Sequence, residues 1–415
     1  MNGSVQGKKV VVGLSGGIAA YKTLTLIRLL VKNGAEVKCV CTPSALEFVT
    51  PLALETLSGY PLYSDLFSSR NESKTAHVGY ADWADLMVVA PASANTIAKF
   101  AHGIADNALT TLFNAFDKTV VLAPAMNTRM YKHPATQSNL DMLRQWGVKV
   151  VAPASGALAC GAQGEGRMPE PETLLAYTEW VCRHLPESSS LGKPQEASYY
   201  TGRKVLLTAG PTVEPIDPVR YLSNHSSGLM GCCLADELSL RGAEVYYVTG
   251  PARVRPHFAP YRLIPVQTAG EMYEAAVSLW PDMDAAILSA AVADYAPAVV
   301  SGQKIKKDSD LLCLELKKTQ DILARLGNEK RKGQLLVGFA LETENELENA
   351  ESKLKRKNAD LIVLNSLRNP GAGFAVATNQ VTFVDRKGRV ESLALKTKEE
   401  VASDILDYLP SLAES

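Results

Sequence analysis

Four short polar segments in the first half of the chain have residue types that bind small anionic ligands. They are residues 15–18, 42–44, 91–96 and 124–127, and each follows a run of apolar residues. In parallel α/β folds the carboxyl ends of the strands meet at one edge of the sheet, where ligands bind. The Ser-Gly-Gly-Ile turn at 15–18 precedes a predicted helix, whose N–H groups and positive end suit a phosphate. Taken alone, this turn could equally be a plain strand-to-helix connection.

Two side chains in this half could transfer protons, His77 and Cys160. A lone histidine is more often a surface or core residue than a catalyst, but histidine is also the side chain best suited to act as a base or donor near neutrality. Cys160 lies among the glycines of residues 156–166, a composition typical of a mobile loop that delivers a thiol to a substrate. The alternative, a small buried hydrophobe, fits the other cysteines better: Cys39, Cys41, Cys182, Cys232 and Cys233.

The second half carries a long polar segment over residues 208–228, between an apolar run and a helix predicted over 230–242. Its Ser, Thr and Asn side chains and the helix N-terminus suit a phosphate or carboxylate, although a helix-capping connection would have the same composition. Downstream, Asp294 follows an apolar run and residues 304–307 read Lys-Ile-Lys-Lys. Such a basic cluster usually lies on a solvent-exposed face of a protein and binds nothing. Near a strand-end aspartate it could instead bind a triphosphate, with the carboxylate available for a ribose or a metal ion.

The chain has 415 residues, of which 46% are hydrophobic and 21% charged, and its net charge is −1. This predicts two or three globular domains and excludes a disordered or collagen-like chain. Because the charge is near zero, we expect no nucleic acid and no membrane as partners. Apolar runs stay shorter than about 18 residues and the first nine residues lack a signal-peptide core, so we expect a cytoplasmic location. The seven scattered cysteines argue against a disulfide framework or a zinc site.

Both halves open with a β-branched run, a polar turn and a helix, the first of these helices being predicted over 23–34. Buried strands are predicted over 9–13, 36–41, 86–90, 119–122 and 148–151, and over 204–210, 244–248, 285–289, 335–339 and 361–364. An antiparallel pair is predicted over 380–385 and 389–395. We therefore predict an α/β fold with two doubly wound, Rossmann-like domains, the first flavodoxin-like. The predicted boundaries are 1–187 and 202–415, with a Ser- and Pro-rich linker over 188–201.

The motifs SGGIAAYK, PASANT, PAMNxxMY and GxLACGxxGxGRM, over about residues 7–182, together resemble the flavin-dependent cysteine decarboxylases. The resemblance implies an FMN cofactor and a substrate whose terminal cysteine loses its carboxyl group. His77 would be the catalytic base, Asn127 and Met130 would hold the substrate carboxylate, and Cys160 would donate a proton. FMN would be bound by Ser15, Gly17, Ile18, Thr42, Ser93, Asn95 and Thr96.

The chemistry explains these residue types. Loss of CO2 from a saturated carbon needs an electron sink, which a flavin supplies by oxidising the cysteine portion to a thioaldehyde. Decarboxylation then leaves an ene-thiolate, and a returned hydride and proton give the thiol, with Cys160 as the proton donor. Because the family builds its flavin site at a subunit boundary, His77 would act across an interface. The resemblance therefore also implies a homo-oligomer with a trimeric decarboxylase half.

The motifs TAGPTxExIDPVRxxSNxSSG, AAVADY, KIKK, GFALET and KLxxKNADLIVxN, over about residues 202–400, resemble the phosphopantothenate–cysteine ligases. In this order, the two halves are similar to the bifunctional bacterial coenzyme A biosynthesis proteins almost end to end. The ligase would use CTP and Mg2+ to activate 4′-phosphopantothenate as an acyl-cytidylate, which the amine of cysteine attacks. The decarboxylase would then convert 4′-phosphopantothenoylcysteine to 4′-phosphopantetheine.

The ligase resemblance also implies roles for individual residues. Asn224 would bind the acyl-cytidylate and Lys304 would be the leading catalytic lysine. CTP would be bound by Ser289, Ala290, Asp294, Lys304, Phe339, Lys353 and Lys357, with Asp321 and Ile322 close to the nucleotide. Two positions depart from the pattern. Leu229 stands where a lysine is common, and Thr319-Gln320 stand where the family has Asn-Pro.

Two other classes of function are alternatives to a bifunctional ligase and decarboxylase. A flavin-binding regulatory or interaction protein without turnover would be favoured by loss of Asn127 or Cys160, and both are present. A two-domain NAD(P) oxidoreductase would explain the doubled strand–turn–helix openings. Neither half, however, has a G-x-G-x-x-G motif followed by an acidic residue about 20 positions later.

Overall fold

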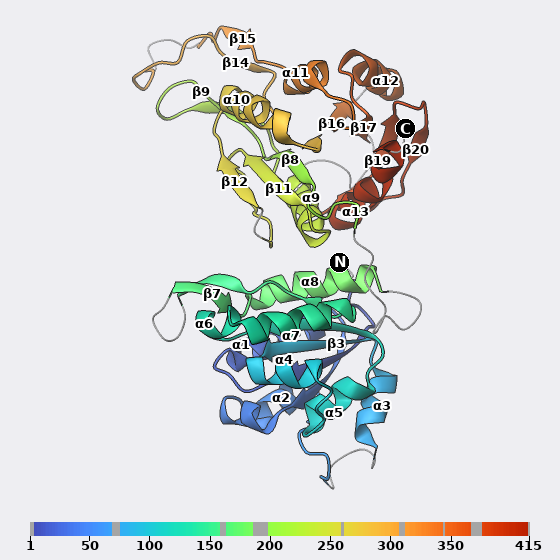
Figure 1. Ribbon diagram of the computed structural model, residues 1–415. Coiled ribbons are helices and arrows are strands. Elements are labelled where there is room, and N and C mark those ends of the chain that lie inside the picture. The colour runs from blue at the N-terminus through green and yellow to red at the C-terminus, as the bar shows by residue number, and fades with distance from the viewer. Residues whose placement is uncertain are drawn as a thin grey trace. The chain divides into compact units, whose positions relative to one another are not determined.

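The computed structural model describes residues 4–68, 75–157, 163–185, 198–258, 261–306, 312–342, 345–366 and 376–413. The chain forms two compact units, Met1–Glu196 and Ala197–Ser415. Each unit is built on its own largely parallel sheet with helices packed on it (Figure 1). Among the described residues, none of the helices has both the length and the apolar content needed to cross a bilayer.

The first unit contains a parallel sheet with strand order β2-β1-β3-β4-β5. Its strands are β1 (Lys9–Leu14), β2 (Glu36–Cys41), β3 (Leu86–Ala92), β4 (Thr119–Pro124) and β5 (Lys149–Val150). Every residue of β3 and β4 is buried. Because helices cover both faces of the sheet, these segments are continuous apolar runs rather than alternating ones. The fifth predicted strand is confirmed, but it shrinks to two residues.

Helices cover this sheet and a hairpin extends from it. The helices are α1 (Ala20–Lys32), α2 (Pro51–Ser58), α3 (Ala76–Trp83), α4 (Ala94–Ala101), α5 (Ala108–Ala115), α6 (Thr128–Tyr131), α7 (Pro134–Gln145) and α8 (Pro171–Arg183), with a 3-10 turn at Pro43–Glu47. The hairpin is β6 (Ala154–Ala157) with β7 (Gln163–Arg167). On one face, Val11 and Val89 pack in a cluster that includes Phe100 and Phe113, whose rings stack 3.9 Å apart. Helices α1 and α8 contribute nothing to that cluster and pack against each other.

The second unit contains a mixed sheet with strand order β12-β11-β8-β13-β16-β17-β19-β20. Its strands are β8 (Lys204–Ala209), β11 (Glu244–Thr249), β12 (Arg262–Pro265), β13 (Ala285–Leu288), β16 (Leu335–Glu342), β17 (Leu361–Ser366), β19 (Val381–Asp385) and β20 (Val390–Ser392). Strand β19 runs antiparallel to β17, and β20 runs antiparallel to β19. The predicted antiparallel addition is therefore confirmed.

Two helical layers cover this second sheet. The helices are α9 (Leu229–Leu240), α10 (Ala269–Leu279), α11 (Ile322–Glu329), α12 (Glu346–Arg356), α13 (Lys398–Tyr408) and α14 (Pro410–Ala413), with a 3-10 turn at Trp280–Asp282. Along β17, Leu361 and Val363 join the core beneath α9 and α13, whereas Ile362 and Leu364 join the core beneath α10, α11 and α12. This alternation follows from the two-residue repeat of a strand.

Several short pairs of strands were not predicted. In the second unit they are β9 (Val213–Pro215) with β10 (Tyr221–Ser223), β14 (Tyr295–Pro297) with β15 (Leu316–Lys318), and β18 (Thr378–Asn379) with β21 (Lys396–Thr397). These strands are two or three residues long, and β15 is exposed throughout. A segment that buries little apolar surface has no periodic pattern to reveal it.

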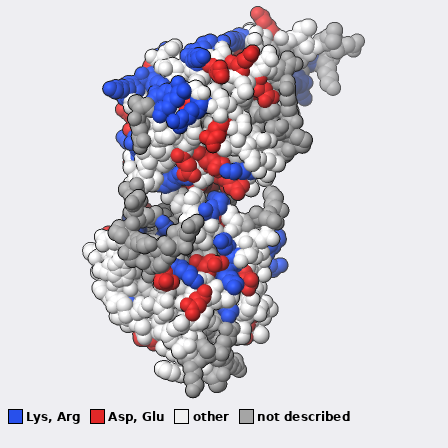
Figure 2. Space-filling view, turned by 90° about the vertical axis from the view of Figure 1, so that its right-hand side faces the viewer, with Lys and Arg blue, Asp and Glu red and all other residues white. Residues whose placement is uncertain are grey.

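Acidic and basic side chains are intermixed over the face of the molecule seen in Figure 2, although lysines and arginines gather in places on the second unit. This distribution agrees with a net charge of −1. Charged ligands must therefore be recognised by local groups, at the sites described next.

Candidate functional site

A cavity of about 610 Å3 opens in the first unit where three strands of the sheet end. Its walls come from residues 16–22 after β1, 93–94 after β3, 125–130 after β4 and 166–168 at the end of β7. The volume lies within the range of about 300–1,000 Å3 that is usual for sites of small molecules and cofactors. The tertiary structure thus brings four separate sequence motifs to one cavity.

Ser15 links two of the turns beneath this cavity. Its buried hydroxyl donates to the carbonyl oxygen of Pro91 at 2.8 Å and accepts the N–H of Ser93 at 2.7 Å. Because these contacts occupy the hydroxyl, Ser15 positions the turns and does not line the cavity. Gly17 does line it, with no other atom within 4 Å of where a side chain would begin. The neighbouring Ile18 is 61% exposed and offers an apolar surface.

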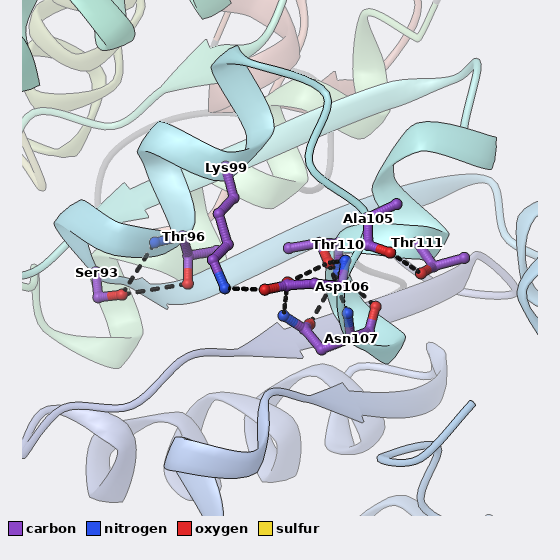
Figure 3. Close-up of polar contacts among 8 residues, drawn as sticks. All are labelled: Ser93, Thr96, Lys99, Ala105, Asp106, Asn107, Thr110 and Thr111. Atoms are coloured by element: carbon purple, nitrogen blue, oxygen red, sulfur yellow. Dashed lines mark hydrogen bonds and ion pairs between the residues drawn. The ribbon is translucent and has the colours of Figure 1, made fainter. Parts of the chain in front are cut away.

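The N-terminal end of α4 lies at the same cavity, where its N-cap residue Ser93 forms part of the wall. The Ser93 hydroxyl accepts the N–H of Thr96 at 3.3 Å and donates to the Thr96 hydroxyl at 3.2 Å. At the other end of α4, Lys99 pairs with Asp106, and this hydrogen bond lowers the pKa of Asp106. Asn107 then caps α5 (Figure 3). These contacts fix both ends of α4.

The predicted ligand residues Asn95 and Thr96 are not among those that line the cavity. Asn95 is exposed and Thr96 is buried behind Ser93. Thr42, in the turn after β2, is also buried and does not line the cavity, and its Oγ1 has no hydrogen-bond partner among the described residues. The Thr42–Ser44 turn packs tightly on the glycine turn, since a side chain at Gly16 would begin 2.5 Å from Ser44 Cβ. An unsatisfied buried hydroxyl beside a glycine turn is what a phosphate ligand would satisfy.

Asn127 and Met130 line the same cavity as the glycine turn. The Asn127 side chain accepts the N–H of Arg129 at 2.8 Å and so begins α6. Met130 is 49% exposed. Both residues line the cavity with Gly17, Ile18 and Ser93, so five of the predicted site residues meet there.

The β6–β7 hairpin joins this wall through Gly166. Its carbonyl oxygen accepts the N–H of Met126 at 2.9 Å. Gly166 has a φ of +126°, and a side chain there would begin 2.4 Å from the Met126 carbonyl oxygen. Only glycine fits this close approach. Cys160 belongs to residues 158–162, between the two strands, and lies outside the described residues.

An ion-pair cluster at the cavity wall was missed in the sequence analysis. Lys22 is buried, and its Nζ donates to Glu170 Oε1 at 2.8 Å and to the Met168 carbonyl oxygen at 3.4 Å. Arg167 Nη2 donates to the same Glu170 oxygen at 2.8 Å. The hydrogen bond from Lys22 is the main reason that the pKa of Glu170 is lowered. Lys22 is the last residue of the SGGIAAYK motif, so a signal for it was present.

We expect Glu170→Gln to lower the free energy of unfolding by about 1 kcal/mol at pH 7, because it removes an ionic partner of the buried Lys22. A carboxylate whose pKa is lowered on folding stabilises the native state above its unfolded pKa of about 4.3 and loses that contribution as the pH falls through its folded pKa. Denaturant unfolding of both proteins at pH 7 and below pH 4 tests this. The difference between them should shrink at the lower pH, and an equal difference at both would contradict the prediction.

His77 lies on α3 and is half-buried. Its neighbour Tyr80 is buried and donates through its hydroxyl to the Pro61 carbonyl oxygen at 3.2 Å. Among the described residues that line the cavity, none comes from α3. Within a single chain, His77 therefore does not line the cavity that Asn127 lines.

In the second unit, the ends of β8 and β13 are tied to the polar segment 208–228. The Ser289 hydroxyl donates to the Thr208 carbonyl oxygen at 2.7 Å. The amide group of Asn224 donates to the Ala291 carbonyl oxygen at 2.9 Å. These contacts place Asn224 beside the predicted nucleotide-binding residues Ser289 and Ala290.

A second group of predicted residues meets where the start of α11, the end of α12 and the middle of β16 come together. Lys357 pairs with Asp321, which also caps α11 by accepting the N–H of Ala324 at 2.8 Å. Lys353 Nζ donates to the Phe339 carbonyl oxygen at 2.9 Å. Ile322 begins α11 and is buried.

The pKa values of two groups in this cluster are displaced. Burial lowers the pKa of Lys353, against the attraction of nearby carboxylates that include Asp294. Burial would raise the pKa of Asp321, but the hydrogen bond from Lys357 and the capping N–H outweigh it, so that pKa is lowered. The cluster is therefore a set of positive and negative groups close enough to displace one another's pKa values.

The two departures from the ligase pattern have structural roles here. The Thr319 hydroxyl donates to the Ala293 carbonyl oxygen at 2.7 Å, and its N–H donates to the Asp294 carbonyl oxygen at 2.9 Å. Thr319 thus holds the loop that carries Asp294. Leu229, the first residue of α9, is half-buried and packs on the core beneath that helix.

Comparison with profiles of known protein families first defines the class of protein to which this chain belongs. The Flavoprotein family profile matches residues 2–181, and the profile described as DNA/pantothenate metabolism flavoprotein C-terminal domain matches residues 200–412. The chain is thus a two-domain flavoprotein of the pantothenate metabolism class. The predicted α/β fold with two Rossmann-like domains is confirmed.

Comparison with individual relatives then identifies the family within this class. The chain is 44% identical to the "Coenzyme A biosynthesis bifunctional protein CoaBC" of Bacillus subtilis (strain 168), over 98% of each protein. It is 48% identical to a "Cysteine/Cysteine sulfinic acid decarboxylase" of an unknown prokaryotic organism, over 88% of this chain and 99% of that one. A crystal structure of the C-terminal domain of a CoaBC protein is 41% identical and covers 52% of this chain and 97% of its own, with a TM-score of 0.43. The chain belongs to the family of coenzyme A biosynthesis bifunctional proteins, which confirms the predicted resemblance.

Proposed function

We propose that this chain catalyses two consecutive reactions, with one active site in each domain. Residues 202–415 would ligate cysteine to 4′-phosphopantothenate with CTP, and residues 1–187 would decarboxylate the product to 4′-phosphopantetheine with FMN. The observation that carries the proposal is the cavity at which Gly17, Ser93, Asn127 and Gly166 meet, since each belongs to a different decarboxylase motif. Membership of the bifunctional family supports the pairing of the two reactions.

The residues around the cavity fit FMN. The open backbone at Gly17 and the first turn of α4 at Ser93 line the cavity and suit its phosphate. The unsatisfied Thr42 hydroxyl lies in the turn that packs on the glycine turn, where it could accept or donate a further hydrogen bond. The exposed side chains of Ile18 and Met130 suit an apolar ring. When bound, FMN supplies the two-electron sink that the loss of CO2 requires. The chain's own part is to orient the substrate, with the amide of Asn127 donating to its carboxylate and Cys160 supplying a proton to the product.

In the ligase domain, the coupled cations Lys353 and Lys357 would hold the CTP phosphates, and Asp294, Phe339 and the first turn of α11 would complete the nucleotide site. Lys304 would stabilise the charge that develops as pyrophosphate leaves. Among the described residues, no three His, Cys, Asp or Glu side chains gather to hold a metal. We infer that Mg2+ enters with the triphosphate, because protein-bound Mg2+ is usually held by substrate phosphates, one or two carboxylates and several waters.

The test is an absorbance spectrum of the purified protein, followed by pyrophosphate and CO2 release with 4′-phosphopantothenate, cysteine and CTP. A flavin spectrum with both products is expected. A flavin spectrum with neither product would favour a regulatory flavoprotein. Pyrophosphate without flavin or CO2 would leave a ligase with an inactive N-terminal domain.

Decarboxylation of free cysteine or cysteine sulfinate is a second candidate function, because a relative named for these substrates is 48% identical. The same assay without CTP and 4′-phosphopantothenate separates the two. CO2 released from cysteine or cysteine sulfinate alone, at a rate comparable to that with the full mixture, would favour this candidate. Dependence of CO2 release on CTP would favour the bifunctional reaction.

We also propose that His77 acts in the cavity of a neighbouring copy within a trimeric decarboxylase half. The support is that α3 contributes nothing described to the cavity of its own chain. We expect His77→Asn and Asn127→Ala to be inactive as decarboxylases when each is alone. Mixed by unfolding and refolding together in equal amounts, they should regain about a quarter of the wild-type rate, because random assembly of a shared site leaves that fraction with both native residues.

The mixed refolding is checked by CO2 release, with each variant refolded alone as the control. Mixtures that stay inactive, although they assemble into oligomers of native size, would contradict a shared site.

A further inference from the structure

The turn at residues 216–220 is organised around a buried carboxylate. The side chain of Asp217 has no exposed surface. Its Oδ1 accepts the N–H groups of Val219 at 2.8 Å and Arg220 at 2.9 Å, and its Oδ2 accepts Arg220 Nη1 at 3.0 Å. The Ile216 N–H closes the turn by donating to the Arg220 carbonyl oxygen at 2.9 Å.

The same carboxylate reaches a segment 88 residues away in the chain. Oδ2 of Asp217 also accepts the N–H of Ile305 at 3.2 Å, and Arg220 Nη1 donates to the Ile305 carbonyl oxygen at 3.3 Å. Both backbone polar groups of Ile305 are therefore held by this one ion pair. Ile305 lies between Lys304 and Lys306, and both lysines are exposed.

The fixed position of Ile305 follows from the cost of burying charge. A carboxylate that is shielded from water must be satisfied by donors, and Asp217 has four of them. Ile305 supplies one, so moving the Lys304–Lys306 segment away would leave the buried oxygen short of a partner. The carboxylate thus restrains the backbone next to Lys304, although it does not touch that side chain.

The other end of the same short stretch carries Asn224. Strand β10 begins directly after Arg220, and its Ser223 hydroxyl donates to the Thr212 carbonyl oxygen at 2.7 Å. Asn224 then donates to Ala291 at 2.9 Å. Residues 217–224 therefore connect the backbone of Lys304 to Asn224.

We propose that Asp217 is a positioning residue for ligation, which holds Lys304 through Ile305 at a set place relative to Asn224. The inference rests on the proposed function of Lys304 in the ligase. The charge of Lys304 can act only within the reach of its side chain, so a displaced backbone shifts the region in which that charge acts. Misplacing a charge by about 1 Å can slow a reaction by about 100-fold.

The test uses the full-length protein with Asp217→Asn, and pyrophosphate release as the readout. We expect kcat to fall by about 10- to 100-fold while the KM for CTP changes by less than about threefold, since Lys353 and Lys357, the lysines proposed to hold the CTP phosphates, do not contact this turn in the described part of the chain. Asp360→Asn is the matched control. Asp360 is also fully buried and accepts Leu336 N–H at 2.7 Å, Lys330 Nζ at 2.9 Å and Arg386 Nη1 at 2.7 Å, but it precedes β17, at the opposite edge of the sheet. Corrected for folded fraction, its kcat should stay within about twofold of wild type.

A double variant separates positioning from general support of the fold. If Asp217 acts through Lys304, adding Asp217→Asn to Lys304→Ala should slow ligation by less than about twofold. Equal slowing in both backgrounds, or equal slowing by Asp360→Asn, would overturn the proposal. If Lys304→Ala alone ligates at the wild-type rate, the proposed role of Lys304 fails and the positioning role fails with it. A slow Lys304→Ala beside an unaffected Asp217→Asn overturns the positioning role alone.

Should Asp217→Asn not fold, Ile305→Pro tests the same contact. Proline removes the N–H that Oδ2 accepts but leaves the bonds of Asp217 to Val219 and Arg220. A folded Ile305→Pro with kcat lowered by about tenfold supports the proposal. A folded variant with an unchanged kcat overturns it.

Discussion

Replacing Lys304 with alanine is expected to slow ligation by about 100- to 1,000-fold, the usual effect of removing one group that stabilises transition-state charge. Lys304 is exposed, and its backbone is held beside the polar segment that carries Asn224. Without its charge, the pyrophosphate leaving group loses a cation, so formation of the acyl-cytidylate should slow. Decarboxylation of supplied 4′-phosphopantothenoylcysteine should continue at the wild-type rate, because that site lies in the other unit.

Pyrophosphate and CO2 release measured on the same preparation test this prediction. Lys332→Ala is the control, since Lys332 is an exposed lysine of the same unit, in the turn between α11 and β16, which contains none of the proposed residues. It should leave both rates unchanged. A Lys304→Ala protein that loses both reactions while still folded would show that the two sites are not separate.

Replacing Cys160 with serine should give the converse result, with ligation intact and formation of 4′-phosphopantetheine lowered by at least about 100-fold. A serine hydroxyl is a much weaker acid than a thiol, so it does not deliver the final proton at a useful rate. Because this step follows the loss of CO2, the ene-thiol form of the product should accumulate. Mass spectrometry identifies it as a species two hydrogens lighter than 4′-phosphopantetheine.

Cys313→Ser is the matched control, because Cys313 is an exposed thiol in the second unit. It should leave both reactions unaltered. If Cys160→Ser formed the reduced thiol product at the wild-type rate, another group would have to be the proton donor. Lys22 and Arg167 would then be the first candidates, because both line the cavity.

The sequence was sufficient to predict most of the framework. Strands buried on both faces, such as β3 and β4, must be continuous apolar runs, so their places in the chain could be found without knowing their neighbours. The polar turns after β1, β3 and β4 could also be located, because each one directly follows an apolar run of this kind. Because parallel strands end at one edge, the convergence of Gly17, Ser93 and Asn127 at one cavity could also be predicted.

Short exposed elements and the roles of single side chains could not be predicted in this way. The β14–β15 and β9–β10 pairs bury too little apolar surface to leave a periodic pattern. Ser15 was predicted to bind the cofactor, and the sequence did not show that its hydroxyl bonds to Pro91 and Ser93. His77 was chosen by residue type and resemblance, and its own chain does not bring it to the cavity.

The sequence by itself therefore determined which buried segments are strands, which polar turns meet at the cavity of the first unit and which family the chain resembles. Only the tertiary structure decided which donor meets which acceptor, as in Lys22 with Glu170, Thr319 with Ala293 and Asp217 with Ile305. The physical reason is the separation along the chain over which each feature acts. Hydrophobic periodicity and turn composition are local and recur every few residues, whereas a hydrogen bond depends on distances of about 3 Å between groups that are tens of residues apart. Such contacts are set by the packing of whole elements, which no local pattern records.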